Sequence, residues 1–319
     1  MRVLVLGGTG FIGSWVVRGL AEAGCEVGVF HRGQTPARMP DDVREILGDR
    51  RTLGESRETL IGFQPDVVID IALFTQTQAE AVRDLFRSHT GRWVVLSSAD
   101  VYRQYDGLRR LSEAPPEATP LTEESPVRER LYPFRADAAG PDDFRYHYDK
   151  ILVERVVLET PELPGTVLRL PRVYGPGDRQ HRLSQYLSAM DAGQSVIALP
   201  QGVAAWRWTR AYVEDVAAAV VLATREARAS GQVYNVGEAH TRPEADWVRQ
   251  IGALCGWAGE VRALDPASAE TDWPDLDWRY HLDTSSARVR EHLGYREPLS
   301  AEEGLRRTIA WERANPPAA

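Results

Sequence analysis

Cysteine and long apolar runs are scarce in this chain of 319 residues, and each scarcity excludes a class of protein. The two cysteines, Cys25 and Cys255, cannot build a disulfide framework or a structural zinc site, so we expect a cytoplasmic protein without a metal. The longest apolar run, 216–223, falls far short of the ~20 residues that a membrane span needs, so we expect no membrane partner. Met1 is followed almost directly by a strand-like run, so we expect no signal peptide.

Lysine is almost absent as well. Of the 38 basic residues, one is lysine, Lys150, and the other 37 are arginine. An ammonium and a guanidinium differ in size, pKa and hydrogen-bonding geometry. A single lysine in so arginine-rich a chain therefore indicates a position at which arginine does not serve, with chance survival as the alternative.

The remaining composition is that of an ordinary folded protein. Hydrophobic residues make up 43% and charged residues 26%, which excludes an intrinsically disordered or coiled-coil chain. The net charge of -8 argues against a nucleic-acid partner, because nucleic-acid-binding surfaces are normally basic. We expect the partner to be a small-molecule substrate.

Strand-like and helix-like segments alternate along the first half of the chain. Apolar runs predict strands at 2–6, 26–30, 66–72, 92–97 and 166–170. Residues between and after these runs predict helices at 11–23, 76–88 and 144–159. Strands joined through helices form parallel sheets that are covered on both faces. The prediction is an α/β fold with a doubly wound parallel sheet.

The second half is organised differently. Residues 103–143 hold six prolines and many charges, and the stretch is too long for an ordinary connection, so we expect a functional flap. Beyond residue 171, short strands mix with helices at 182–192, 212–227, 242–255, 284–293 and 301–314. We therefore predict a first domain over 1–171, which includes the flap, and a smaller mixed α/β lobe over 172–319. Some segments of the lobe return to the first domain.

A glycine-rich turn, 7–13 (Gly-Gly-Thr-Gly-Phe-Ile-Gly), joins the first strand to the first helix. Gly7 permits the tight turn, Gly10 lets the backbone approach a pyrophosphate, and Gly13 lets the helix pack close to the strand. The N-terminus of the helix adds free N–H groups for the phosphates. The sequence thus predicts a dinucleotide cofactor, held by Gly7, Thr9, Gly10, Phe11, Ile12 and Gly13.

The end of the second predicted strand indicates which dinucleotide. NAD-binding chains carry an acidic residue there that bonds the ribose hydroxyls, but this chain has His31 followed by Arg32. A guanidinium suits a 2′-phosphate, so we predict NADP, with NAD as the alternative if Arg32 is only a solvated turn residue. Asp49 and Arg50, further along the chain, either contact the adenine or form a surface turn.

A serine, a tyrosine and the single lysine form the candidate catalytic group. Ser98 ends a strand at the carboxyl edge of the sheet, where open parallel sheets bind ligands. Tyr146 precedes Lys150 by four residues, and positions i and i+4 share a helix face. A nearby ammonium lowers the pKa of a phenol, which can then exchange a proton with a substrate while hydride moves to or from nicotinamide. Tyr148, two residues before the lysine, is the rival for this role.

Several motifs together are similar to those of one known family. They are the glycine turn, Ser98, 101–102, Tyr146 with Lys150, the run 169–177 (Arg-Leu-Pro-Arg-Val-Tyr-Gly-Pro-Gly), 212–217, 234–237 and 293–295. On these residues the chain resembles an extended short-chain dehydrogenase/reductase. More narrowly, it resembles the NAD-dependent epimerase/dehydratase family typified by UDP-galactose 4-epimerase. The resemblance spans almost the whole chain and implies a Rossmann domain with a smaller substrate lobe.

The resemblance also implies roles for single residues. Tyr146 is then the general acid/base, and Lys150 lowers the pKa of that phenol and bonds the nicotinamide ribose. Ser98 hydrogen-bonds the reacting oxygen, the glycine turn holds the pyrophosphate, and Ala72 borders the cofactor. The implied assembly is a homodimer that pairs the helix carrying Tyr146.

The chain departs from the family pattern on the substrate side. Sugar-nucleotide dehydratases carry an Asp-Glu pair just after the catalytic hydroxyl residue, whereas this chain has Ala99 and Asp100. Elimination of water needs an acid for the leaving hydroxyl, which alanine cannot supply, so a dehydratase is disfavoured. Asp100 is either a second acid/base or a helix cap.

Two arginines that hold the substrate diphosphate in the epimerases are replaced here by Trp208 and Trp273. Indole rings offer flat apolar faces for rings or sugar C–H surfaces, or they pack in the core. Arg172 stands where the family often has asparagine. The candidate substrate residues are therefore Asp100, Arg172, Trp208 and Trp273.

The sequence thus predicts an NADP- or NAD-dependent oxidoreductase or epimerase. It acts on a secondary alcohol or ketone of a sugar-like or ring-containing metabolite. One alternative is a nucleotide-sugar epimerase that retains its cofactor, with Arg207 or Arg210 on the phosphates. Another is a non-catalytic dinucleotide-sensing or interaction protein, which the intact Ser98, Tyr146 and Lys150 disfavour.

Overall fold

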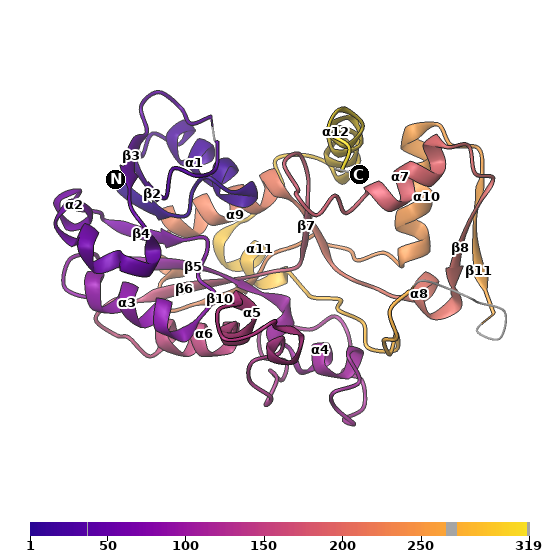
Figure 1. The fold of residues 1–319 in the computed structure, drawn as a ribbon, viewed down its shortest axis with the longest axis horizontal. Coiled ribbons are helices and arrows are strands. Elements are labelled where there is room, and N and C mark those ends of the chain that lie inside the picture. The colour runs from indigo at the N-terminus through magenta and orange to yellow at the C-terminus, as the bar shows by residue number, and fades with distance from the viewer. Residues whose placement is uncertain (37, 266–272, 318–319) are drawn as a thin grey trace.

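A seven-stranded parallel sheet forms the larger part of the molecule (Figure 1). The computed structural model describes residues 1–36, 38–265 and 273–317. The strands lie in the order β10-β6-β5-β4-β1-β2-β3. Their bounds are β1 Arg2–Leu6, β2 Glu26–His31, β3 Arg44–Leu47, β4 Val67–Asp70, β5 Arg92–Ser98, β6 Gly165–Leu170 and β10 Val233–Asn235. The predicted α/β class is confirmed, and the strand order reverses between β1 and β4, where such sheets bind ligands.

Two layers of helices cover this sheet because successive side chains of a strand point to opposite faces. Val3 and Val5 join an apolar core with residues of α1 (Phe11–Glu22) and α9 (Val213–Arg225). Leu4 and Leu6 join a second core on the other face, which also contains buried residues of helices α2, α3 and α6. Their bounds are α2 Arg57–Gly62, α3 Gln76–Phe86 and α6 Lys150–Leu158. A further helix, α11 (Ala287–Leu293), contacts α9 and β10 and contributes to the first core.

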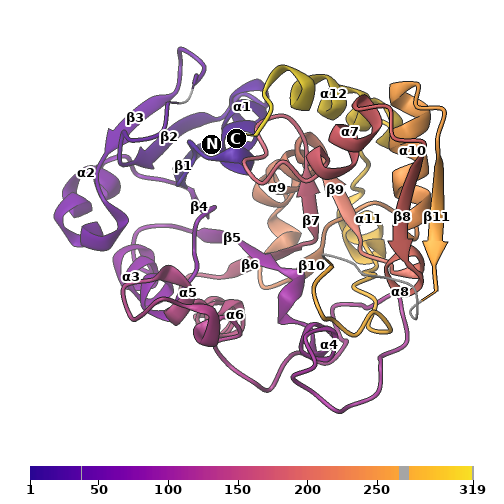
Figure 2. The same ribbon diagram turned by 45° about the vertical axis from the view of Figure 1, so that its right-hand side comes forward.

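A smaller lobe follows β6. It holds two short parallel pairs, β7 (Arg172–Tyr174) with β9 (Arg210–Tyr212) and β8 (Val196–Pro200) with β11 (Glu260–Leu264). Figure 2 shows β8 and β11 side by side with α10 next to them, on the side of the molecule away from β3. The helices of the lobe are α7 Ser184–Asp191, α8 Gln201–Ala205, α10 Glu244–Cys255 and α12 Ala301–Ala314.

The proline-rich flap 103–143 folds back onto the rest of the chain. It begins with α4 (Arg103–Leu108), and Tyr102, just before it, makes an antiparallel bridge with Val127. Leu121 makes a parallel bridge with Thr284, near the C-terminal end of the chain. These contacts bring the flap against the carboxyl edge of β5 and against the smaller lobe. Within the described ranges, none of the helices has the length and apolar character of a transmembrane span.

The prediction of one helix over 144–159 is wrong. The structure contains α5 (Phe144–His147) and α6, with Tyr148 and Asp149 extended between them. Each helix begins at its own aspartate cap, Asp143 for α5 and Asp149 for α6. Asp149 also accepts a hydrogen bond from the backbone N–H of Tyr132 in the flap at 2.6 Å, which fixes the position of the break.

Candidate active site

The glycine-rich turn forms an open cradle at the start of α1. Gly7 has φ +90°, a backbone conformation that favours glycine. A Cβ atom on Gly13 would lie 2.6 Å from the carbonyl oxygen of Gly7, so only glycine lets α1 approach this closely. A Cβ on Gly10 would meet no heavy atom within 4 Å, which shows that this side of the turn is open. Gly10 also caps α1 without a side chain, so the first N–H groups of the helix face an anion site.

A cavity of about 450 Å³ extends from this cradle past the ends of β2 and β4. Its lining includes predicted cofactor residues from four segments of the chain, namely Gly7, Thr9, Gly10, Arg32, Asp49, Arg50 and Ala72. Phe11 and Ile12, predicted for the same role, are not among the lining residues and pack against the core. The open glycine turn and this cavity together fit a dinucleotide.

Three arginines lie along the cavity near β2 and β3, and their partners differ. Arg50 forms an ion pair with the fully buried Asp70 at the end of β4. Arg51 hydrogen-bonds to Asp49 and lowers the pKa of that carboxyl to about 2. Arg32 is exposed, and within the described residues its guanidinium has no hydrogen bond or ion pair.

The break between α5 and α6 separates Tyr146 from Lys150. The two residues do not share a helix face, so the predicted i, i+4 geometry is wrong. The ring of Tyr146 instead lies against the guanidinium of Arg135, with 4.7 Å between the guanidinium carbon and the ring centroid. In the part of the chain that the structure describes, no hydrogen bond joins Tyr146 to Ser98 or Lys150.

Tyr148, the rival tyrosine, is the phenol that the structure brings to Ser98. Its hydroxyl donates a hydrogen bond of 2.6 Å to Oδ2 of Asp100, and Ser98 is a further hydrogen-bonding neighbour. The ring is buried and lies 6.1 Å from the ring of Phe74, which lines the dinucleotide cavity. Burial and the adjacent Asp100 raise the pKa of Tyr148 well above its ordinary value, so the phenol stays protonated at neutral pH.

Asp100 is held from the other side by an arginine of the flap. Arg128 is fully buried, and its Nε donates to the carbonyl oxygen of Asp100 at 2.5 Å. Its Nη2 lies 4.0 Å from Oδ1 of Asp100 and 3.6 Å from Oδ1 of Asp149. Burial raises the pKa of Asp100, whereas Arg128 opposes that shift. The flap therefore supplies the positive charge that faces Asp100, a role that no local sequence pattern indicated.

Lys150 lies beneath the same site. Its ammonium donates to the carbonyl oxygen of Leu73, just after β4, at 2.6 Å and to the carbonyl oxygen of Leu96, within β5, at 2.8 Å. The nitrogen is 5.0 Å from the ring centroid of Phe74. Burial lowers the pKa of Lys150 to about 8, although Asp100 and Asp70 oppose the shift. An ammonium fits between two close carbonyl groups where a planar guanidinium does not, which accounts for the single lysine.

Two of the predicted substrate residues meet in the smaller lobe. The guanidinium carbon of Arg172 lies 5.0 Å from the ring centroid of Trp208. Trp208 contacts Trp206, Trp206 contacts Trp278, and Trp278 contacts Trp273, with ring centroids 5.1, 5.1 and 6.1 Å apart. Trp208 and Trp273 are thus the two ends of one aromatic chain.

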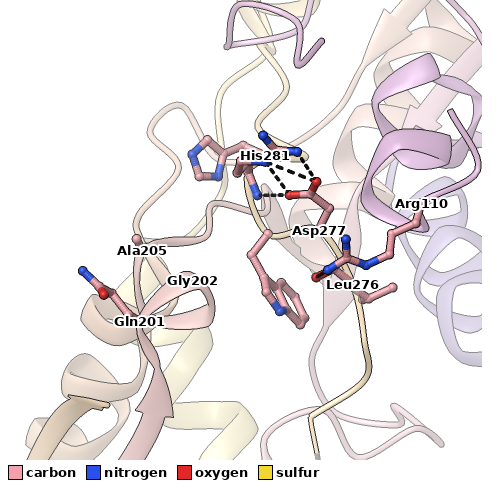
Figure 3. Close-up of a pocket in the computed structure, with 9 residues that line it drawn as sticks. Arg110, Gln201, Gly202, Ala205, Leu276, Asp277 and His281 are labelled. Atoms are coloured by element: carbon pink, nitrogen blue, oxygen red, sulfur yellow. Dashed lines mark hydrogen bonds and ion pairs between the residues drawn. The ribbon is translucent and has the colours of Figure 1, made fainter. Parts of the chain in front are cut away.

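A second cavity, of about 630 Å³, lies beside this aromatic chain (Figure 3). Trp278 lines it together with His281, residues of α8 and two arginines. Both arginines have acidic partners, since Arg110 pairs with Asp275 and Arg279 pairs with Asp277. The positive charge at this cavity is therefore largely neutralised.

A comparison of the sequence with known protein families agrees with the parallel sheet and the glycine-rich turn described above. A model described as the NAD dependent epimerase/dehydratase family matches residues 3–237. The chain belongs to this family. It is therefore an enzyme of the extended short-chain dehydrogenase/reductase type, as the resemblance implied.

Members of the family with curated names are distant relatives of this enzyme. It is 28% identical to a 2′-dehydrokanamycin reductase of Streptomyces kanamyceticus over 281 residues, 86% of this chain and 70% of the relative. It is 27% identical to a dTDP-glucose 4,6-dehydratase of Streptomyces niveus, over 99% of this chain and 94% of the relative.

Solved structures of family members share the fold. An epimerase from Methanothermobacter thermautotrophicus superposes with a TM-score of 0.71 at 20% identity, over 98% of this chain and 92% of the other. A UDP-glucose 4-epimerase from Thermus thermophilus in complex with NAD gives 0.68 at 23% identity, over 99% and 100%.

Proposed function

We propose that this enzyme transfers hydride between NADP(H) and a secondary alcohol or ketone of a sugar-derived metabolite. The observation that carries the proposal is the buried phenol of Tyr148, hydrogen-bonded to Asp100 beside Ser98, next to the cavity that the glycine turn opens. The nicotinamide cofactor supplies or accepts the hydride when it is bound there. The similarity to a protein named 2′-dehydrokanamycin reductase supports the reductase direction.

The enzyme's own residues then move the proton. The protonated phenol of Tyr148 donates its proton to the oxygen of a ketone as that oxygen gains charge. In the reverse direction Asp100 accepts a proton through Tyr148, because the two groups already share a hydrogen bond. Ser98 bonds the same substrate oxygen, and Lys150 supplies a positive charge below it. Tyr146, which lies away from these groups, is not part of the proposed site.

A screen of keto-sugars tests the proposal. Wild-type enzyme is mixed with NADPH and each compound, and loss of the reduced nicotinamide is followed by absorbance. We expect turnover with at least one compound in wild type and its loss in Tyr148→Phe. Tyr148→Phe is also titrated with NADPH, and unchanged cofactor binding shows that the variant has kept its fold.

The free guanidinium of Arg32 supports NADP over NAD. It follows β2, lines the cavity, and makes no hydrogen bond or ion pair within the described residues, although its charge is felt by Asp49. Hydrogen bonds to charged groups contribute about 1.5–3 kcal/mol, so we expect Arg32→Ala to weaken NADPH binding about 10- to 100-fold. NADH binding should change little. Fluorescence titration measures both, with the exposed Arg44→Ala as the control; equal loss for NADPH and NADH contradicts the assignment.

The ammonium of Lys150 sets an expected upper pH limit. Since its pKa is about 8, Lys150 loses its charge above that pH, and Asp70 and Asp100 lose a positive neighbour. We expect kcat/KM to fall as the pH rises through about 8. The free energy of unfolding should change in the opposite direction. Because the pKa of Lys150 is about 8 in the folded protein and 10.5 in its ordinary state, the unfolded chain binds more protons between these two pH values. The free energy of unfolding should therefore rise as the pH increases from about 8 to 10.5. A pH–rate profile that stays flat through this range contradicts the role of Lys150.

Ala99 keeps the dehydratase disfavoured, because it is buried and offers no acid. A nucleotide-sugar epimerase remains the second candidate, and one observation favours it. Arg207 is half-buried in the lobe, and its Nη1 donates to the Thr241 carbonyl, which leaves its other donors for a phosphate. Arg210, in contrast, forms an ion pair with the buried Glu244.

We also propose that the enzyme is a homodimer that pairs through α5 and α6, where the apolar side chains of Phe144 and Leu158 are exposed. We further propose a cytoplasmic location.

A further inference from the structure

Arg172 is a half-buried arginine that has no acidic partner among the described residues. It begins β7, and its backbone N–H bonds to the Thr209 carbonyl. Its side chain lies over Trp208 and, within the described residues, makes no hydrogen bond or ion pair. Burial lowers the pKa of this guanidinium. A charge that is partly removed from water and makes no hydrogen bond within the protein is unfavourable, so this arrangement needs an explanation.

The other arginines show how unusual this is. Ten described arginines besides Arg172 lack a hydrogen bond or ion pair, and all of them are exposed. They are Arg18, Arg32, Arg38, Arg44, Arg87, Arg130, Arg155, Arg179, Arg225 and Arg296. Every other described arginine that is buried or half-buried has a partner, such as Glu154 for Arg169 or Asp70 for Arg50.

The acidic groups near Arg172 are already engaged. Glu244 accepts from Tyr186 at 2.8 Å and pairs with Arg210. Asp178 pairs with Arg182 at 2.6 Å. Of the three arginines in this local cluster, Arg182 and Arg210 therefore have acidic partners and Arg172 has none. A further carboxylate, Glu238, lies near Arg210 and accepts a hydrogen bond from Tyr174.

The position of Arg172 links it to the reacting centre. Ser98, the last residue of β5, pairs in register with Leu170 of β6, and Arg172 follows two residues later. At about 3.3 Å per residue, its Cα lies only about 7 Å beyond the strand end that faces Ser98. A side chain as long as arginine reaches a substituent on a substrate that Ser98 and Tyr148 hold.

We propose that Arg172 binds an anionic group of the substrate, a carboxylate or a phosphate, close to the carbon that exchanges hydride. Trp208 supports the flat face of the guanidinium and leaves its edge for the two oxygens of the anion. The second cavity does not offer this, because Arg110 and Arg279 each have an aspartate partner. The inference rests on the proposed function and names its substrate class as anionic.

The test uses small anions on the full-length enzyme loaded with NADP⁺. Thermal unfolding is measured with sodium phosphate, sodium acetate or sodium chloride at constant ionic strength, for wild type, Arg172→Met, Arg172→Lys and the exposed control Arg179→Met. We expect phosphate or acetate to stabilise wild type and Arg179→Met more than chloride does. In Arg172→Met the anion concentration that gives the same stabilisation should rise about 10- to 100-fold, with Arg172→Lys intermediate.

The two anions distinguish the source of the charge: a response to acetate identifies a carboxylate site and a response to phosphate a phosphate site. Arg172→Met should also be at least as stable as wild type in chloride, since it removes a half-buried charge that has no partner and keeps an apolar side chain on Trp208. No anion response in wild type, or an equal response in Arg172→Met, overturns the proposal. Titration with NADPH runs in parallel, because failure to bind it would refute the proposed function and leave the anion result to be judged separately.

Discussion

Replacing Tyr148 with phenylalanine is expected to lower kcat by about 10²- to 10⁴-fold, the usual contribution of a positioned general acid. The substitution removes the only proton donor that the structure places between Asp100 and the substrate side of Ser98 in the described chain. Replacing Tyr146 with phenylalanine should leave kcat unchanged, because its ring lies on Arg135 outside this group. Steady-state kinetics of the two variants with one substrate make the comparison.

The pair of variants separates chemistry from folding. Both remove one hydroxyl from a tyrosine, and they lie two residues apart. NADPH titration shows whether each variant keeps the cofactor site. If Tyr146→Phe instead abolishes turnover while Tyr148→Phe keeps it, the proton donor is the residue that lies four positions before Lys150, and the broken helix described here is not the active arrangement.

The second large effect concerns stability and a different residue of α6. Glu154 is buried, accepts two hydrogen bonds from Arg169 at 3.0 and 2.7 Å, and accepts another from Ser97 at 2.6 Å. Arg169 also donates to Tyr102 and to the Glu123 carbonyl in the flap. The carboxylate thus joins α6, β5 and β6 directly, and the flap through Arg169.

Glu154→Ala should therefore lower the free energy of unfolding by about 3–5 kcal/mol, because it leaves the Arg169 guanidinium buried without its acid. Glu159→Ala, which truncates an exposed glutamate at the end of the same helix, should change it by no more than about 0.5 kcal/mol. Urea unfolding at neutral pH measures both values. Equal and small changes would show that the buried pair does not hold these elements together.

The parts of the fold that depend on short-range pattern were predictable from the sequence. The strand β1, the glycine turn and α1 follow within 22 residues, and each glycine has a local steric reason. The dinucleotide cavity also followed from that turn and from the strand ends at Arg32 and Ala72. These features depend on residues that are close together in the sequence, so the sequence pattern is enough to predict them.

The arrangement around Tyr148 was not predictable in the same way. Apolar spacing over 144–159 favours one helix, but Asp149 caps a new helix and bonds to Tyr132 of the flap, 17 residues away. Asp149 directly before an apolar run was the available signal for a helix start. The partner of Asp100, Arg128, is contributed by a loop 28 residues further on, and no periodicity points to such a contact.

The candidate substrate residues were predictable one by one, but their contacts and partners were not. Counting from family motifs singled out Arg172 and Trp208 separately, but not that the two side chains lie against each other. That Arg172 has no acidic partner is visible only in three dimensions, because Glu244 and Asp178 are paired with other arginines. Whether Arg172 has a partner therefore depends on how the side chains of the smaller lobe pack, and the sequence pattern does not give that packing.

We propose that the enzyme binds NADP(H) reversibly and exchanges it at each turnover. Native mass spectrometry of the purified protein, followed by titration with NADPH, NADH and UDP, tests it most directly. We expect the purified protein to be free of cofactor, to bind NADPH more tightly than NADH and not to bind UDP. Cofactor that co-purifies, together with tight binding of UDP, would contradict it and identify a nucleotide-sugar epimerase.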